Sequence, residues 1–104
     1  MKLWIDDMRQ PPTENWIWIR STNEAITAIR QYERNMHSDI IIISLDHDAG
    51  DFVSDGGDYI QILNWLEANH IVDTGYFFQI HSMNPVGVQN MRAIIQHNGW
   101  REIS

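Results

Sequence analysis

Hydrophobic and polar residues alternate along the chain in blocks that predict five strands and three helices. The apolar runs predicted as strands are residues 2–5, 16–20, 40–45, 76–80 and 100–103. The run from Ile40 to Leu45 is continuous and rich in β-branched residues, which is typical of a central parallel strand buried on both faces. In the second run, Trp16 and Trp18 lie on one face and Ile17 and Ile19 on the other, so we expect partial cover on both sides.

Helical spacing and capping signals lie between these runs. Ser21 and Glu24 have the spacing of a capping box, and the helix that they open should end near Asn35. The last helix begins with Asn84 as its N-cap and closes at Gly99. The apolar positions at helical spacing are Ile26, Ile29 and Tyr32 or Glu33 in the first helix, and Tyr59, Ile62, Leu63 and Leu66 in the second.

Strands that alternate with helices predict an α/β fold. We expect an open, mainly parallel five-stranded sheet flanked by about three helices, in a single domain spanning residues 1–104. Ligands of such sheets bind at the carboxyl ends of the strands. Polar clusters follow three of the predicted strands, namely Asp6-Asp7, Asp46-His47-Asp48 and His81-Ser82. These clusters are therefore the candidate site.

Composition narrows the classes of function. The formal charge of −7 disfavours extended nucleic-acid binding, because it repels the phosphodiester backbone. The same charge is compatible with the binding of one phosphate through a metal ion. The chain contains no cysteine, so disulfides and thiolate zinc sites are excluded and a cytoplasmic location is expected. The longest apolar run has six residues, far fewer than the roughly twenty that span a bilayer, so no membrane partner is expected.

The acidic clusters require something to offset their charge. Three aspartates, at 46, 48 and 51, follow the central strand, where repulsion and partial burial favour a metal ion, another cation or a proton. The alternative to a cation site is that Asp6-Asp7 only starts a turn, and that one of the later aspartates caps a helix while the others face solvent. An EF-hand calcium loop is excluded, because the twelfth position counted from Asp46 is Gly57 instead of glutamate.

The five histidines divide by position. Three of them, His37, His70 and His97, fall at the predicted carboxyl ends of helices, where an imidazole interacts favourably with the helix dipole. His47 and His81 directly follow core strands, where each could be a metal ligand, a proton carrier or a hydrogen-bonded core residue.

The segment "HSMNPVG" predicts a place for an anion. The helix that begins there points its free N–H groups towards the strand ends, Ser82 and Asn84 could bond phosphate oxygens, and Gly87 would let a ligand approach the backbone. Arg9 could reach another phosphate oxygen. As an alternative, Arg9 forms an ion pair with the neighbouring Asp6-Asp7.

The pattern resembles the receiver domains of two-component response regulators. That resemblance implies a flavodoxin-like fold in which Asp6, Asp7 and Asp46 hold magnesium, Asp46 accepts a phosphoryl group and Ser82 stands at the hydroxyl position. Three departures are evident, because no helix separates the first two strands, none follows the fifth, and the lysine that senses the phosphoryl group is missing.

A closer resemblance is to the cyclic-phosphate processing receiver-like family, on the motifs "DDMRQPP", "LDHD" and "HSMNPVG". It covers almost the whole chain. With the resemblance, the carboxylates of the first two motifs are expected to converge on Mg²⁺ or Mn²⁺, which hard oxygen ligands favour. The predicted metal ligands are Asp6, Asp7, Asp46 and Asp48.

We therefore expect a metal-dependent phosphoesterase that acts on a small cyclic phosphate or a nucleotide end. The predicted catalytic residues are Asp46, His47 and His81, with Arg9, Ser82, Asn84 and Gly87 at the phosphate. The alternative is a signalling or binding module without turnover, either a phosphoaspartate switch or a degenerate receiver. The sequence carries no indication of oligomeric state.

Overall fold

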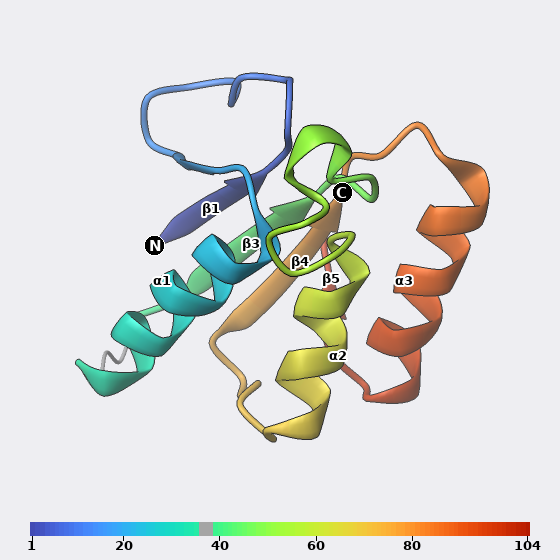
Figure 1. The fold of residues 1–104 in the computed structure, drawn as a ribbon. Helices are drawn as coiled ribbons and strands as arrows, with labels where there is room; N and C mark the ends of the chain where they lie inside the picture. Colours follow the sequence, from blue (N-terminus) through green and yellow to red (C-terminus); the bar gives the residue numbers. More distant parts are fainter. Residues whose placement is uncertain (36–38) are drawn as a thin grey trace.

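The computed structural model describes residues 1–35 and 39–104, and within them five parallel strands form one sheet (Figure 1). The strand order is β2-β1-β3-β4-β5. The strands are β1 (Lys2–Ile5), β2 (Ile17–Ile19), β3 (Ile41–Leu45), β4 (Tyr76–Ile80) and β5 (Arg101–Glu102). The predicted open parallel sheet is confirmed, and its order is that of a flavodoxin-like, receiver-like domain.

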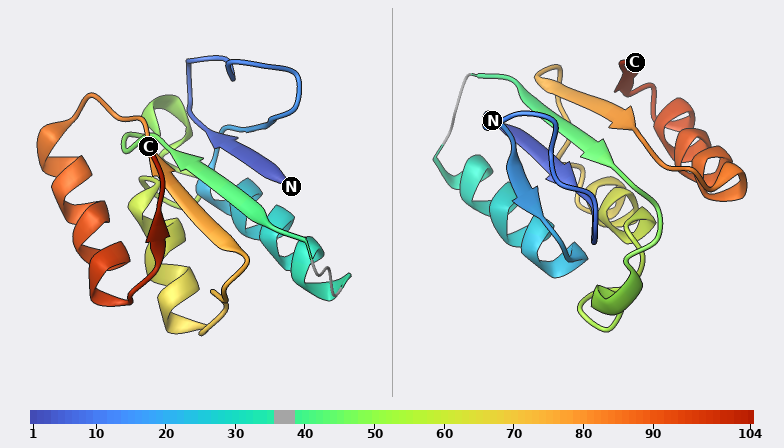
Figure 2. Two further views of the ribbon diagram at one scale, coloured as in Figure 1. Left: turned by 180° about the vertical axis from the view of Figure 1, so that it is seen from behind. Right: turned by 90° about the horizontal axis from the view of Figure 1, so that it is seen from above.

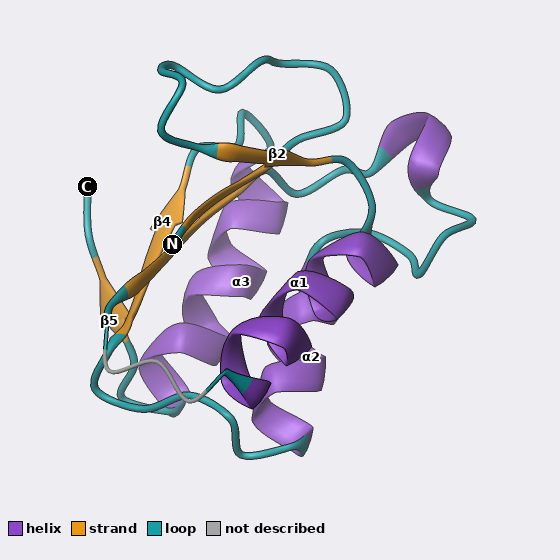
Figure 3. Ribbon diagram, turned by 90° about the vertical axis from the view of Figure 1, so that its left-hand side faces the viewer, coloured by secondary structure: helices purple, strands orange, loops and turns teal. Residues whose placement is uncertain are grey.

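The helices all cover the same face of this sheet. They are α1 (Thr22–Arg34), α2 (Ile60–Ala68) and α3 (Pro85–His97), and a 3₁₀ turn, η1 (Gly50–Phe52), follows β3. The side view in Figure 3 and the rear view in Figure 2 both place the strands on one side and the three helices on the other. A loop of residues 6–16 joins β1 to β2 without a helix, and no helix follows β5 in the described residues. Both departures from the receiver pattern are therefore present.

The predicted caps begin the first and third helices. Ser21 accepts a hydrogen bond of 3.1 Å from the Glu24 N–H, and the Glu24 carboxylate accepts one from the Arg20 N–H, one residue earlier than in the usual capping box. Asn84 Oδ1 accepts from the Gly87 N–H at 3.1 Å, and proline occupies the first position of α3. These caps satisfy N–H groups that the helices leave without a partner.

The core lies between the sheet and the helices. Leu3, Ile43 and Phe78 are fully buried there, and α1 adds Ala25, Ile29 and Tyr32. The opposite face has no helix over it. The prediction that the central strand is buried on both faces is therefore only partly correct, because Ile42 is half-buried and Ile40 precedes the strand with 52% of its surface exposed.

The helix-terminal histidines are largely where the pattern put them. His97 is the last residue of α3, and His70 follows α2 in a left-handed conformation with φ of 51°. His37 lies outside the described residues. Across the ranges 1–35 and 39–104, no helix has both the length and the apolar character to cross a membrane.

The difference in burial between Ile43 and Ile40 predicts different effects of their substitution on stability. Replacing Ile43 by alanine should lower the free energy of unfolding by about 2–5 kcal/mol, because it opens a cavity in the core. The matched change Ile40→Ala removes the same atoms from an exposed position and should cost less than about 1 kcal/mol. Urea unfolding followed by circular dichroism measures both, and equal losses would contradict the one-sided core.

Candidate functional site

The site begins where three neighbouring strands end at the same level. Ile5, Leu45 and Ile80 pair across β1, β3 and β4. The hydrogen-bond ladder continues one residue further, because the Asp46 N–H donates to Ile5 O and the His81 N–H donates to Leu45 O, both at 2.9 Å. The first residues after the strands are thereby placed side by side.

Three carboxylates converge at this edge. Oxygens of Asp6, Asp7 and Asp46 all lie within 4.8 Å of one another. Asp6 is only 3% exposed, and its Oδ1 accepts from the N–H groups of Met8 at 3.0 Å and Arg9 at 2.7 Å. The turn that was the alternative explanation for Asp6 is thus present, and it holds the carboxylate in place beside the other two.

The electrostatics of this trio favour a cation. Burial raises the pKa of Asp7 above its usual value, and the negative charges of Asp6 and Asp46 raise it further, against the opposing hydrogen bond from the backbone of Asp7 itself. A divalent ion would remove this repulsion, and three carboxylates are a suitable donor set for Mg²⁺ or Mn²⁺. The residues present therefore fit the expected metal.

Gly50 makes room for one of these carboxylates. Its φ is +54°, and a Cβ atom built on it would lie 2.2 Å from Asp7 Oδ2. Any other residue would collide with the carboxylate and would also strain the backbone. The glycine of the "DHDAGD" segment thus serves the acidic pair that follows β1.

His81 is bound directly to the carboxylate trio. Its Nε2 lies 3.0 Å from Asp6 Oδ2 and its Nδ1 lies 2.8 Å from Ser44 Oγ. The ring stacks on Trp4 with centroids 3.8 Å apart and an angle of 5° between the planes. Both ring nitrogens and one ring face are therefore held, so the imidazole has a defined orientation.

The protonation state of His81 is coupled to the direction in which the Ser44 hydroxyl donates its proton. Ser44 Oγ lies 2.7 Å from Gln79 Oε1 and 2.8 Å from His81 Nδ1, but it has a single proton. When His81 is neutral and donates from Nε2 to Asp6, the Ser44 proton must point to Nδ1. When the imidazole carries both protons, Ser44 can donate to Gln79. Burial lowers the pKa of His81 below its ordinary value, and the hydrogen bond to Asp6 partly opposes this.

His47 and Asp48 belong to a separate group. With Asp58 they have ligand atoms within 4.8 Å of one another, and Nδ1 of His47 lies 2.9 Å from Asp48 Oδ1. That hydrogen bond is the main reason why the pKa of Asp48 is lowered. The structure does not place Asp48 in the trio of Asp6, Asp7 and Asp46. The reason is local, because Asp48 lies three residues past the end of β3 and turns towards the start of α3.

Gly87 is close to a side chain of the protein. A Cβ atom at Gly87 would lie 2.4 Å from His47 Cγ, so the imidazole packs against the first turn of α3. The expectation that a ligand approaches the backbone at this glycine is therefore wrong, because His47 fills that space and Asn84 already caps the Gly87 N–H. The glycine instead brings the "LDHD" and "HSMNPVG" segments together.

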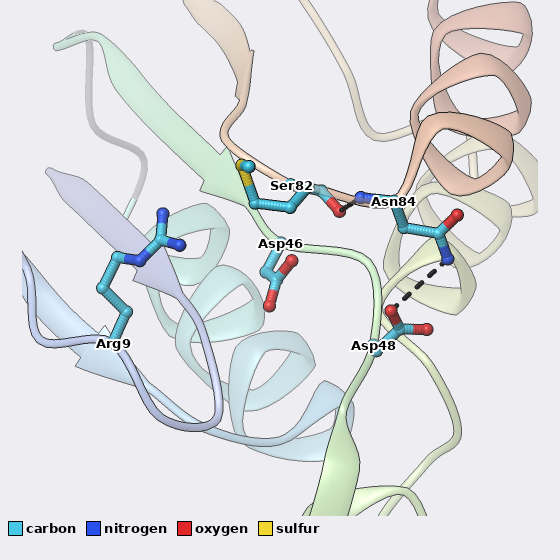
Figure 4. A pocket seen from close by; sticks show the side chains of 6 residues that line it. Arg9, Asp46, Asp48, Ser82 and Asn84 are labelled. Atoms are coloured by element: carbon cyan, nitrogen blue, oxygen red, sulfur yellow. Dashed lines mark hydrogen bonds between the residues drawn. The ribbon is translucent and has the colours of Figure 1, made fainter.

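A cavity of 340 Å³ opens beside Asp46, as Figure 4 shows. It is lined by Arg9, Asp46, Asp48, Ser82, Met83 and Asn84. Arg9 reaches it from the loop after β1, opposite Ser82 and Asn84. Among the described residues no ion pair includes Arg9, so the alternative of a pair with Asp6 or Asp7 is not found.

The polar groups of this cavity have capacity left for an anion. Ser82 Oγ accepts from the Asn84 N–H at 3.1 Å, so its own proton can be donated to a ligand. The Oδ1 atom of Asn84 is engaged in capping α3, which leaves its Nδ2 group, 3.4 Å from Asp48 Oδ2, to face the cavity. Arg9, Ser82 and Asn84 together can bind phosphate oxygens.

Four residues of the site were missed from the sequence. Ser44 and Gln79 hold or adjoin the His81 ring, Gly50 accommodates Asp7, and Asp58 accepts from the Ala49 N–H. A signal existed for the first two, because the next-to-last residue of a strand points to the same face as the residue that directly follows the strand. No comparable signal marks Asp58.

Comparison with known proteins identifies a family but no individual relative. The family model described as "Cyclic-phosphate processing Receiver domain" matches residues 1–97. Neither the search of curated proteins nor that of solved structures found a match. The three motifs that carry the site all lie within the matched residues.

The grouping of the carboxylates predicts which changes weaken metal binding. Replacing Asp46 by asparagine should reduce the affinity for Mn²⁺ by about 10- to 100-fold or more, since even an outer-shell partner is worth that much. The matched change Asp48→Asn, in a residue outside the trio, should alter it by less than about threefold. Titration calorimetry measures both variants, and an equal loss in the two would place Asp48 among the ligands.

The lowered pKa of His81 predicts a pH dependence of stability. The unfolded chain binds the proton more tightly than the folded one, so this contribution is complete above pH 6.5 and is lost as the pH falls towards the folded-state pKa. The free energy of unfolding should fall there by up to about 1.4 kcal/mol per pH unit. In His81→Asn, urea unfolding with EDTA should lack this component. An unchanged pH profile in the variant would contradict the assignment.

Proposed function

The chain belongs to the cyclic-phosphate processing receiver domain family, and from this we propose that it is a metal-dependent phosphoesterase that acts on a small cyclic phosphate or a nucleotide end. One observation carries the proposal. His81 is hydrogen-bonded to Asp6 of the carboxylate trio, and Asp46 of the same trio lines a cavity together with Arg9, Ser82 and Asn84. In this proposal a metal site, a proton carrier and a phosphate site therefore lie next to one another.

The trio of Asp6, Asp7 and Asp46 would hold Mg²⁺ or Mn²⁺. When bound, such an ion supplies Lewis-acid polarisation of a phosphoryl oxygen and lowers the pKa of water. Asp48, which lines the cavity, would have a different role, because its contact with His47 orients that imidazole. Asp46 lines the cavity and belongs to the trio, so it is the residue closest to both functions.

The phosphate would be held from two sides. The Arg9 guanidinium contributes charge from the loop after β1, while the Ser82 hydroxyl and the Asn84 amide donate from the start of α3. Two phosphate oxygens held this way fix the line along which water attacks the phosphorus. Gly87 contributes indirectly, because the His47 ring that rests on it lies next to Asp48.

Hydrolysis of a cyclic phosphodiester needs one proton removed and one supplied. Water attacks phosphorus, one ester P–O bond breaks, and the leaving oxygen becomes a hydroxyl. His81, neutral near pH 7 because of its lowered pKa, would take the proton of the water at Nδ1 as the Ser44 proton turns to Gln79, with Asp6 holding the Nε2–H. His47, paired with Asp48, would give a proton to the leaving oxygen.

The competing function is a phosphoaspartate switch at Asp46. The exposure of Asp46 to the cavity favours this possibility. Against it, the only lysine of the chain is Lys2, whose ammonium lies 4.4 Å from the Trp16 ring centroid at the start of the sheet. A switch also has no use for a histidine bonded within the trio.

Turnover tests the proposal directly. With Mn²⁺ and a panel of 2′,3′- and 3′,5′-cyclic nucleotides, product formation followed by ³¹P NMR should show hydrolysis of at least one of them. The variant His81→Asn should lose about two to four orders of magnitude in rate, the usual worth of a positioned acid or base. Its fold and Mn²⁺ affinity should stay nearly unchanged, since three carboxylates remain.

Three outcomes would contradict parts of this proposal. No turnover of any cyclic nucleotide would remove the phosphoesterase activity. A stable His81→Asn protein with full turnover would leave His47 as the proton carrier. Treatment with a small phosphodonor, followed by intact mass, should give no adduct, whereas a labile phosphoryl adduct that is lost in Asp46→Asn would establish the switch.

A further inference from the structure

A second cavity is lined by the loop that also carries Arg9. It has a volume of 380 Å³ and lies between the loop of residues 6–16 and β2. In Figure 1 this loop rises from the end of β1 and returns into β2. Its lining has two parts. One is a surface of tryptophans and prolines (Pro11, Pro12, Trp16, Trp18), and the other is a set of polar side chains (Gln10, Thr13, Glu14).

The indoles of this region are held by specific contacts. The Trp18 Nε1–H donates to Asp6 O and the Trp4 Nε1–H donates to Arg9 O, both at 2.8 Å. Trp16 meets Trp4 edge to face, with centroids 5.7 Å apart and an angle of 71°. The loop is therefore tied to the sheet through tryptophans, and the aromatic walls of the cavity have defined positions.

Each indole of the cavity carries a cation on one face. The Lys2 ammonium lies 4.4 Å from the Trp16 ring centroid, and the Arg20 guanidinium lies 4.8 Å from that of Trp18. Both indoles also line the cavity, so a planar ligand there can contact them. In a chain of charge −7, these cations also lower the local repulsion of an anionic ligand.

Consecutive residues of the loop line the two cavities. Arg9 lines the phosphate cavity and the next residue, Gln10, lines the aromatic one. Their Cα atoms are about 3.8 Å apart, as in any trans peptide. Trp18 is likewise connected to the metal side, because its N–H is bonded to the backbone of Asp6. A ligand that carries both a phosphate and a planar ring offers one group suited to each cavity.

We propose that the cavity between Trp16, Trp18 and Pro11-Pro12 is a subsite for the base of a nucleotide whose phosphate lies against Arg9, Ser82 and Asn84. The proposal rests on the proposed function and names its substrate class, a cyclic phosphate that bears a nucleobase instead of a bare sugar phosphate. Stacking on an indole is tolerant of base identity. The side chains of Gln10, Thr13 and Glu14 are the groups that can bond the base edge.

Binding measurements test this subsite without any turnover. With Mg²⁺ present, titration calorimetry compares adenosine 3′-monophosphate and uridine 3′-monophosphate with ribose 5-phosphate. Both nucleotides should bind at least about tenfold more tightly than the sugar phosphate, which is the order of magnitude that base stacking supplies. In Trp16→Leu this advantage should disappear while the affinity for ribose 5-phosphate stays the same.

Three further variants control the result. Trp16→Phe retains an aromatic ring and should keep most of the advantage, which separates stacking from a folding defect. Ile17→Ala, at an exposed neighbouring position, should change nothing. Asp46→Asn should weaken the binding of all three ligands alike, because it acts on the shared phosphate and metal side.

The outcomes separate this inference from the proposed function. Equal binding of nucleotides and ribose 5-phosphate, unaffected by Trp16→Leu, overturns the subsite and leaves the phosphate site standing. Trp16-dependent binding of the two nucleotides, together with no effect of Asp46→Asn on that binding, supports the subsite and contradicts the phosphate site. No binding of either nucleotide overturns the subsite.

Discussion

The parallel pairing of β1, β3 and β4 is the constraint on which the site depends. Ile5, Leu45 and Ile80 share one level of the sheet, and the next backbone bonds still belong to its ladder. Asp6 and Asp46 are therefore brought together by main-chain hydrogen bonds before any side-chain attraction acts. Carboxylates would not approach one another without such a frame, because their mutual repulsion opposes it.

The one-sided placement of the helices leaves the second face of the sheet free for other contacts. The face covered by α1, α2 and α3 carries core residues such as Leu3, Ile43 and Phe78. The other face carries Trp4, Ser44 and Gln79, with no helix above them. The loop of residues 6–16 contacts this uncovered face, where the Trp4 Nε1–H donates a hydrogen bond to Arg9 O. Trp4 also stacks on His81, so the same indole connects the loop to the carboxylate trio.

The three sequence motifs act through one another. Gly50, just after "LDHD", makes room for Asp7 of the first motif, and Gly87 of the third motif receives the ring of His47. Residues of all three motifs were identified individually from the sequence, but Gly50 and these contacts were not. Glycine by itself indicates only conformational freedom or close approach. Which group makes the approach depends on segments that are about 40 residues apart in the chain.

The sequence by itself determined the elements, their parallel arrangement and the acidic character of the sheet edge, because periodicity and capping are local properties that survive in any compact fold. The bounds of β1 and β4 were predicted as the structure has them, and the other elements to within a few residues. Only the tertiary structure decided that Asp48 leaves the trio for His47, and that Ser44 meets His81. Those choices depend on side-chain packing between distant segments, where a displacement of a few ångströms changes which groups bond, and no local pattern records such a displacement.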